Sequence, residues 1–132
     1  MLLRSDLKAK NWTAARDGLL LAASADPLRA PMAWRALSWL AEITGYPEEA
    51  ARWIDAALEG DPTDAWSLYQ SGRILAQRDD VQGARESFVR ALDQELDFAD
   101  ALVSLGELAL TGGDNSADER YFERAVDRKS VV

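Results

Sequence analysis

The residue types that most often carry catalysis are absent or scattered in this 132-residue chain. It has no cysteine and no histidine, which removes thiol nucleophiles, disulfides, most zinc sites and the commonest general base. Carboxylates, lysines, tyrosines and serines remain, and nothing in the sequence gathers them into a catalytic motif. The sequence therefore predicts a protein that is not an enzyme and that uses no cofactor.

Three groups of carboxylates could be considered as calcium ligands. They are Glu48–Glu49, Asp61 with Asp64, and Asp79–Asp80. Each group lies in a predicted turn or first helical turn, where carboxylates cap free amides and interact favourably with the helix dipole. None has the ligand spacing of an EF-hand loop, so we expect no metal site.

The charge balance limits the class of partner. The chain has 23 acidic and 15 basic residues, a net charge of −8, which disfavours binding to nucleic acids and to anionic membranes. No apolar run approaches the roughly 20 residues of a membrane-spanning helix. Residues 1–10 carry charges throughout and lack the apolar core of a signal peptide. We expect a cytoplasmic protein, or a periplasmic one if the chain is part of a longer protein.

A repeat with a period of 34 residues organises the chain. Seven positions recur at this spacing, and all but one of the residues there are small or apolar. They are Trp34, Leu37, Ser38, Ala41, Ala50, Ile54 and Ala57, then Leu68, Ser71, Gly72, Leu75, Ala84, Phe88 and Ala91, then Leu102, Leu105, Gly106, Ala109, Asp118, Phe122 and Ala125. Only Asp118 breaks the pattern. A fixed period without insertions is typical of stacked repeats.

Each unit of the repeat is predicted to be a pair of helices. Apolar residues are spaced by three and four from Pro31 to Ile43 and again from Glu48 to Glu59, as on one face of a helix. Gly45 ends the first helix of this pair, and the residues 60–62 (Gly-Asp-Pro) end the second. Small residues at the predicted crossing point allow the two helices to approach closely.

The predicted helices lie near 31–43, 48–59, 64–77, 81–94, 98–110 and 116–128. They form a single domain, 1–132, with units at about 1–30 (incomplete), 31–64, 65–98 and 99–132. In the first unit, residues 1–10 are expected to be an incomplete leading helix, and Asn11 is expected to begin the next one. Core positions of that second helix are then Trp12, Ala15, Leu19 and Ala22.

The pattern resembles the tetratricopeptide repeat (TPR) family. The family motif runs from an aromatic or leucine, through a leucine and a small residue, to an alanine, an aromatic, a second alanine and a closing proline. The most complete unit has Trp34, Leu37–Ser38, Ala50, Ile54, Ala57 and Pro62 in this order. The next two units match in phase over nearly the whole chain, although Leu96 replaces the closing proline in one of them.

The resemblance implies an all-α, right-handed superhelical solenoid of stacked antiparallel helical hairpins. It also implies that the first helix of each hairpin lines a concave face. Residues of these helices that lie off the core stripe are then the partner-binding candidates. They are Met32, Arg35, Trp39, Ile43, Trp66, Tyr69, Arg73, Val103, Glu107 and Leu110.

Three aromatic candidates, Trp39, Trp66 and Tyr69, have two interpretations. Exposed aromatics beside arginines are the usual composition of a binding hot spot. The alternative is that these rings fill gaps between neighbouring hairpins. The other tryptophans, Trp12, Trp34 and Trp53, are read as packing residues.

The arginines of this face also have two interpretations. Arg35 and Arg73 could each hold a carboxylate of a partner with paired donors. They could equally form salt bridges to local acids such as Glu42 and Glu107.

We therefore predict a non-catalytic protein–protein interaction module. It is expected to bind a peptide or helix of a partner protein in its concave groove. The alternative is a self-associating scaffold that forms a homo-oligomer through its terminal hairpins, because an incomplete first unit leaves apolar surface at the end of a stack.

Overall fold

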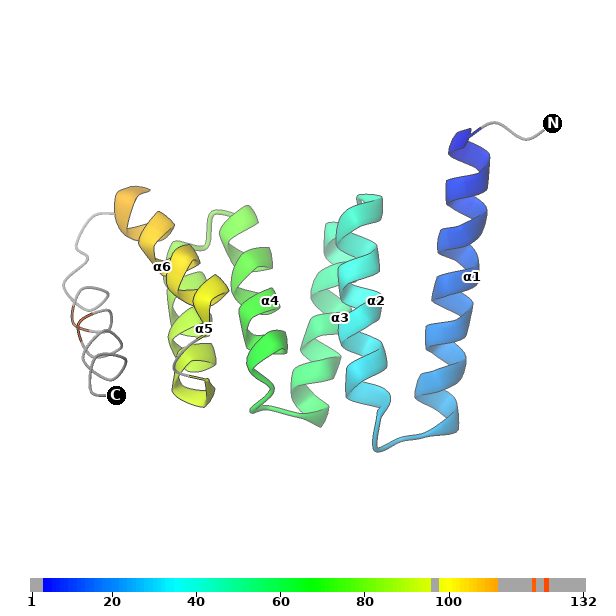
Figure 1. The fold of residues 1–132 in the computed structure, drawn as a ribbon, viewed down its shortest axis with the longest axis horizontal. Coiled ribbons are helices and arrows are strands. Elements are labelled where there is room, and N and C mark those ends of the chain that lie inside the picture. Colours follow the sequence, from blue (N-terminus) through cyan, green and yellow to red (C-terminus); the bar gives the residue numbers. More distant parts are fainter. Residues whose placement is uncertain (1–3, 96–97, 112–119, 121–122, 124–132) are drawn as a thin grey trace. The chain divides into compact units, whose positions relative to one another are not determined.

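The described part of the chain consists of helices and short turns (Figure 1). The computed structural model describes residues 4–95, 98–111, 120 and 123. Within these residues there are six helices of four residues or more and no strand. They are α1 (Arg4–Ala25), α2 (Ala30–Thr44), α3 (Pro47–Gly60), α4 (Ala65–Gln77), α5 (Val81–Gln94) and α6 (Ala99–Thr111). None of the described helices is both long and apolar enough to cross a membrane.

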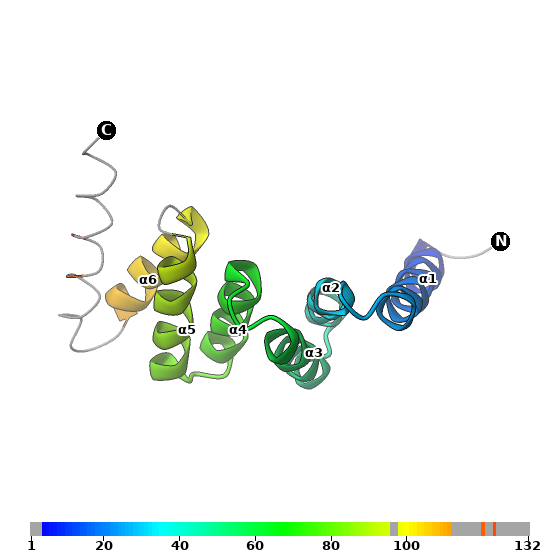
Figure 2. The same ribbon diagram turned by 90° about the horizontal axis from the view of Figure 1, so that it is seen from below.

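The helices fall into two compact units, residues 1–62 and residues 63–132. The first unit contains α1 and the hairpin of α2 and α3, and the second contains the hairpin of α4 and α5 followed by α6. In both ribbon views the two helices of each hairpin lie side by side (Figures 1 and 2). Five of the predicted helices correspond to α2, α3, α4, α5 and α6, and their predicted ends agree with the observed ends within two residues. The helix predicted at 116–128 lies largely outside the described residues.

The hairpin of α2 and α3 closes over the small and apolar positions of the repeat. Leu37, Ala50, Ile54 and Ala57 are at most 2% exposed. At the crossing, the Ser38 hydroxyl donates a hydrogen bond of 2.7 Å to the backbone carbonyl of Ala50. The predicted close crossing is therefore confirmed in this hairpin.

The hairpin of α4 and α5 has the same architecture with a different pair at the crossing. Ala84, Phe88 and Ala91 are at most 1% exposed. A Cβ atom added to Gly72 would lie 2.5 Å from the Phe88 ring, closer than real Cβ contacts. Gly72 is therefore glycine because the Phe88 side chain occupies the space that a larger residue would need.

Equivalent turns join the two helices of each hairpin but are made of different residues. Gly45 ends α2 with φ of 87°, in the left-handed region that glycine adopts without strain. The residue 34 positions later, Asp79, takes the same region with φ of 61°. Asp80 then caps α5, because its side chain accepts a hydrogen bond of 3.0 Å from the Gly83 backbone N–H. The expectation that this carboxylate caps free amides is confirmed.

One close contact joins the two ends of the first hairpin. A Cβ added to Gly60, the last residue of α3, would lie 2.6 Å from Cγ of Pro31 and 3.5 Å from the Trp34 ring. The start of α2 therefore packs directly on the backbone at the end of α3. A side chain at position 60 would force these two helix ends apart.

The structure corrects the prediction for the first unit. Residues 4–25 form one continuous helix, so Asn11 does not begin a new one. No proline or glycine lies between Arg4 and Asp17, and the lysines and alanines there favour an uninterrupted helix over the break inferred from repeat spacing. The core prediction for this unit is also wrong, because Ala15 and Ala22 are exposed and Trp12 is 38% exposed.

Candidate functional site

A hollow of about 440 Å³ lies within the second unit, where α4 and α6 face each other beside α5. Apolar side chains and charged side chains of both signs line it. The lining residues are Tyr69, Arg73, Ala76, Gln77, Phe88, Asp100, Val103, Ser104, Glu107 and Leu108. Its volume lies in the range of sites that bind small ligands or single anchor side chains.

Tyr69 connects this hollow to an aromatic cluster. Its ring centroid lies 5.3 Å from that of Phe98 and 5.9 Å from that of Phe88, and both phenylalanines are at most 5% exposed. The Arg73 guanidinium carbon lies 5.9 Å from the centroid of the Tyr69 ring, within the range of a cation–π contact. The contact orients a cation at the edge of an apolar floor.

The acidic side of the hollow comes from α6. Asp100 and Glu107 are exposed at positions seven apart, which places them on the same side of the helix. Val103 lies between them and is 60% exposed. The hollow therefore has an apolar floor, a cation on α4, and two carboxylates and an exposed aliphatic side chain on α6.

Four of the ten predicted partner-binding residues meet at this hollow: Tyr69, Arg73, Val103 and Glu107. Trp66 is adjacent, with its ring centroid 5.9 Å from that of Tyr69 and 4.8 Å from that of Phe98. Leu110 lies on the same helix as Glu107 and is 88% exposed, but it does not line the hollow.

The other four predicted residues lie on α2, in the first unit. Met32, Trp39 and Ile43 are 60%, 55% and 48% exposed, and Arg35 is half-buried. The spacing of the four residues places them along one side of α2, where Met32, Trp39 and Ile43 form an exposed apolar row.

The two interpretations of the aromatic residues both have support in the second unit. Trp66 and Tyr69 do pack against Phe98, as the gap-filling interpretation requires. Trp66 nevertheless remains 49% exposed, and Tyr69 lines the hollow. These rings therefore combine a packing contact with an accessible face. Trp39, by contrast, has the exposure expected of a residue outside the core.

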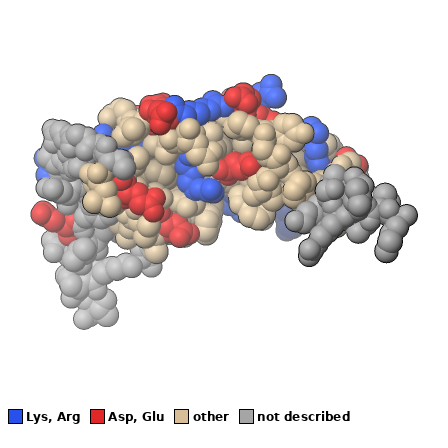
Figure 3. Space-filling view, turned by 90° about the horizontal axis from the view of Figure 1, so that it is seen from above, with Lys and Arg blue, Asp and Glu red and all other residues tan. Residues whose placement is uncertain are grey.

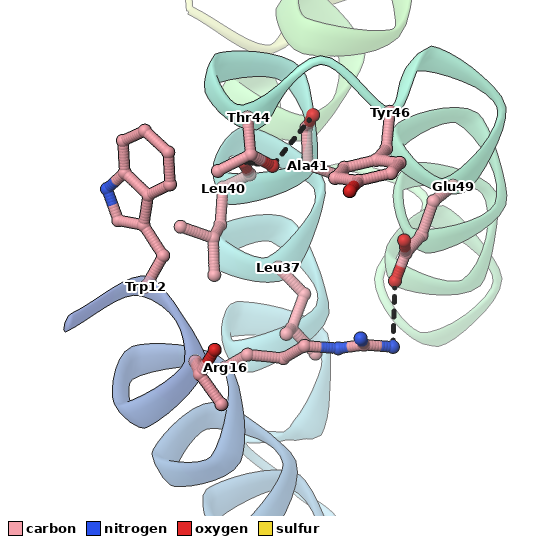
Figure 4. Close-up of a pocket in the computed structure, with 9 residues that line it drawn as sticks. Trp12, Arg16, Leu37, Leu40, Ala41, Thr44, Tyr46 and Glu49 are labelled. Carbon is pink, nitrogen blue, oxygen red and sulfur yellow. Dashed lines mark hydrogen bonds and ion pairs between the residues drawn. The ribbon is translucent and has the colours of Figure 1, made fainter. Parts of the chain in front are cut away.

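Sequence reasoning missed a second hollow, of about 450 Å³, within the first unit (Figure 4). Trp12 and Tyr46 lie on opposite sides of a floor that includes Leu37, Leu40 and Ala41. The sequence predicts a packing role for Trp12. Trp12 lines this hollow instead. In the repeat, α1 occupies the place of the second helix of a hairpin, and the described residues contain no first helix to pack beside it.

An ion pair crosses one side of this second hollow. Arg16 on α1 lies 2.9 Å from the Glu49 carboxylate at the start of α3, as the dashed line in Figure 4 shows. The same carboxylate oxygen, Oε1, accepts a hydrogen bond of 3.4 Å from the Trp53 indole N–H. The ion pair joins α1 to the hairpin through partly exposed side chains, whereas the Trp53 contact lies within α3.

Positive and negative side chains are interspersed on the face shown in Figure 3. Among the described residues drawn on that face, the basic side chains form no extended patch.

Comparison with known proteins identifies what the chain is similar to. A family model described as tetratricopeptide repeat matches residues 1–65 and again residues 69–130. No curated protein matches the chain by sequence. Among solved structures, the chain is similar to the crystal structure of MamA, with 21% identity and a TM-score of 0.73 over 96% of this chain and 75% of that chain. The predicted resemblance and the all-α helical-hairpin solenoid are therefore confirmed.

Proposed function

Because this chain belongs to the tetratricopeptide repeat family, we propose that it binds a short segment of a partner protein at the hollow between α4 and α6. The chain is a protein–protein interaction scaffold, and its family is typically a non-catalytic interaction module. We further propose that the protein acts in the cytoplasm.

The observation that carries the proposal is the contact between Arg73 and the Tyr69 ring at the edge of the hollow. A guanidinium held over an aromatic ring is oriented, so less rotamer entropy is lost when it binds a carboxylate. The ring beneath it supplies apolar area for a neighbouring side chain of the ligand. Aromatic and arginine side chains together are typical of binding hot spots.

The arrangement of charge suggests the chemistry of the ligand. Arg73 on α4 favours an acidic residue, whereas Asp100 and Glu107 on α6 favour a basic one. Between them, the apolar floor favours a large aliphatic or aromatic anchor. We therefore propose a segment with an apolar anchor between residues of opposite charge. The dependence of its affinity on salt should be modest, since the anchor supplies most of the binding energy.

The exposed row on α2 is a second surface for the same function. Met32, Trp39 and Ile43 present apolar area along one helix, with Arg35 beside it. Such a row suits the apolar face of a helix or an extended segment. We propose it as a separate contact surface.

The experiment uses short fluorescein-labelled peptides, each with one leucine or phenylalanine anchor, flanked by lysine and glutamate in both orders or by like charges. Fluorescence anisotropy should show the tightest binding for a peptide of mixed charge. Glu107→Lys should lower the affinity for that peptide about tenfold, because the attraction between residue 107 and the peptide's basic residue becomes a repulsion. Glu86→Lys, at an exposed position on α5 that does not line the hollow, is the matched control and should leave the affinity unchanged.

Two results would contradict this site. One is that no peptide of the set binds at millimolar concentration. The other is that Glu107→Lys and Glu86→Lys weaken binding equally, which would mean that only the net charge of the protein matters.

Self-association is the second candidate function, and one observation favours it. Residues of α1 whose counterparts are fully buried in the later hairpins are exposed here. Ala15 and Ala22 are exposed, whereas the corresponding Ala50 and Ala57 of α3 are 0% exposed.

A further inference from the structure

The hollow of the first unit is bordered by two accessible aromatic rings. It measures about 450 Å³, and Trp12 and Tyr46 lie on opposite sides of it, above a floor that includes Leu37 and Leu40 (Figure 4). Trp12 is 38% exposed and Tyr46 is 61% exposed, so a ligand can reach both rings. Tryptophan and tyrosine rings attract cations, and a planar guanidinium also stacks on them.

Two polar groups that line this hollow can only accept hydrogen bonds from a ligand. The Thr44 hydroxyl uses its hydrogen within α2, where the backbone carbonyls of Leu40 and Ala41 lie 2.8 Å and 3.3 Å from its oxygen. What remains for a ligand is the lone pairs of that oxygen. The ionised Glu49 carboxylate has no donor at all. A ligand that matches these two groups must therefore supply donors.

The hollow already contains one guanidinium, which comes from the chain itself. Arg16 reaches from α1 to Glu49, with Nη2 2.9 Å from the carboxylate (Figure 4). The Arg16 side chain is 52% exposed, whereas that of Glu49 is 25% exposed and also accepts a hydrogen bond from the Trp53 indole N–H. The carboxylate is thus held in place while the guanidinium is half in solvent. Because an ion pair this exposed contributes little to stability, another cation can replace Arg16 at low cost.

The balance of charge favours a cation over an anion as that ligand. The whole chain has a net charge of −8. Residues 30–60, which form α2 and α3, have two basic and five acidic residues, a net charge of −3. This field attracts cations, and an anion entering the hollow would meet the fixed carboxylate of Glu49. A cation that replaces Arg16 leaves the charge beside Glu49 balanced.

We propose that this hollow binds an arginine side chain of a partner protein, which replaces Arg16 on Glu49. The aliphatic stem of the ligand lies over Leu37 and Leu40, and its guanidinium bonds to both oxygens of the carboxylate beside the two rings. Arg16 is then an internal competitor that occupies the site in the free protein. The inference concerns the first unit alone and does not depend on the hollow between α4 and α6.

The first test compares a charged ligand with a neutral one of the same shape. The probes are the blocked tripeptide alanine-arginine-alanine and its citrulline analogue. Binding is followed through the indole N–H signal of Trp12 in proton–nitrogen NMR spectra, assigned with Trp12→Phe. The arginine peptide should shift this signal in a saturable way, and the citrulline peptide should bind about tenfold more weakly, because it lacks the charge-assisted hydrogen bonds. Equal affinities of the two peptides, or no shift at high millimolar concentration, would overturn the proposal.

The second test uses the two members of the ion pair, whose variants should act in opposite directions. Glu49→Gln should lower the affinity for the arginine peptide about tenfold, because the charged acceptor is lost. Arg16→Gln should raise it about twofold to fivefold, because the internal competitor is removed. Glu59→Gln, at an exposed position of α3 that does not line the hollow, is the matched control and should leave the affinity unchanged. If Arg16→Gln weakens binding as Glu49→Gln does, the pair only holds α1 in place and the replacement of Arg16 is wrong.

The third test keeps the ion pair intact. Tyr46 is 61% exposed, so Tyr46→Leu should leave the circular dichroism spectrum unchanged while lowering the affinity for the arginine peptide about threefold. An unchanged affinity would remove the aromatic ring from the site. Glu107→Lys is titrated in parallel and should leave the shift of the Trp12 signal as it is in the unmodified protein. Failure of this inference is thereby distinguished from failure of the proposed site between α4 and α6.

Discussion

The Ser38 hydroxyl donates a hydrogen bond of 2.7 Å to the backbone carbonyl of Ala50, where α2 crosses α3. The residue equivalent to Ser38 in the next hairpin is Gly72, which has no side chain and lies against the Phe88 ring. The residue equivalent to Phe88 in the first hairpin is the smaller Ile54. Each crossing is thus filled by a complementary pair, serine with isoleucine or glycine with phenylalanine.

The first prediction exchanges one pair for the other. Gly72→Ser should destabilise the second hairpin by about 1–3 kcal/mol, because its Cβ would overlap the Phe88 ring. Phe88→Ile should cost about 2 kcal/mol by leaving a cavity. The double variant should lose clearly less unfolding free energy than the two single variants lose together. Urea unfolding followed by circular dichroism measures the three values, and strict additivity would show that the two side chains do not share one space.

The second prediction concerns burial at the crossing. Ala84 is 0% exposed, so Ala84→Glu should place a charge without a partner between α4 and α5 and lower the midpoint of thermal unfolding severely. Gln82→Glu introduces the same side chain at an exposed position of the same helix and serves as the control. An unchanged midpoint for Ala84→Glu would contradict the packed crossing.

The third prediction concerns the two turns. Asp79 has φ of 61°, a conformation that costs a residue with a side chain more than it costs glycine. Asp79→Gly should therefore stabilise the protein by up to about 1 kcal/mol, and Gly45→Ala, with φ of 87° in the equivalent turn, should destabilise it by about 1 kcal/mol. Opposite signs in chemical unfolding would show that another interaction of these residues dominates.

The fourth prediction separates binding from packing among the aromatic residues. Trp39 is 55% exposed, so Trp39→Ala should change the free energy of unfolding by no more than about 0.5 kcal/mol. Tyr69 contacts Phe88 and Phe98, so Tyr69→Ala should cost about 2–3 kcal/mol. Tyr69→Phe keeps the ring and is the variant for binding assays. A large loss of stability in Trp39→Ala would identify that residue as a packing residue after all.

The fold could be predicted from the sequence largely because small residues recur where helices cross. Ala50 and Ala84 mark the crossings at a constant spacing, and Gly45 marks a turn. The continuity of α1 could not be predicted in this way. The repeat spacing alone predicts a break at Asn11, whereas the local residues favour an unbroken helix.

The candidate site could be predicted in part. Helical phase identified Tyr69, Arg73, Val103 and Glu107, because residues off the core stripe of neighbouring first helices point to a shared side. The hollow beside Trp12 could not be predicted, since it depends on how α1 lies against the hairpin of α2 and α3. No periodicity within one helix contains that information.

The contact between Gly60 and Pro31 has a consequence for how such a chain can be recombined. In the next hairpin, Gln94 corresponds to Gly60 and Ala65 corresponds to Pro31. The larger residue of the pair is therefore on the first helix in one hairpin and on the second helix in the other. A chimera that joined α2 to α5 would bring Pro31 against Gln94 and Ser38 against Phe88, with too much volume at both places. Gene duplication or shuffling that cuts between hairpins preserves these pairs, whereas a cut inside a hairpin separates them.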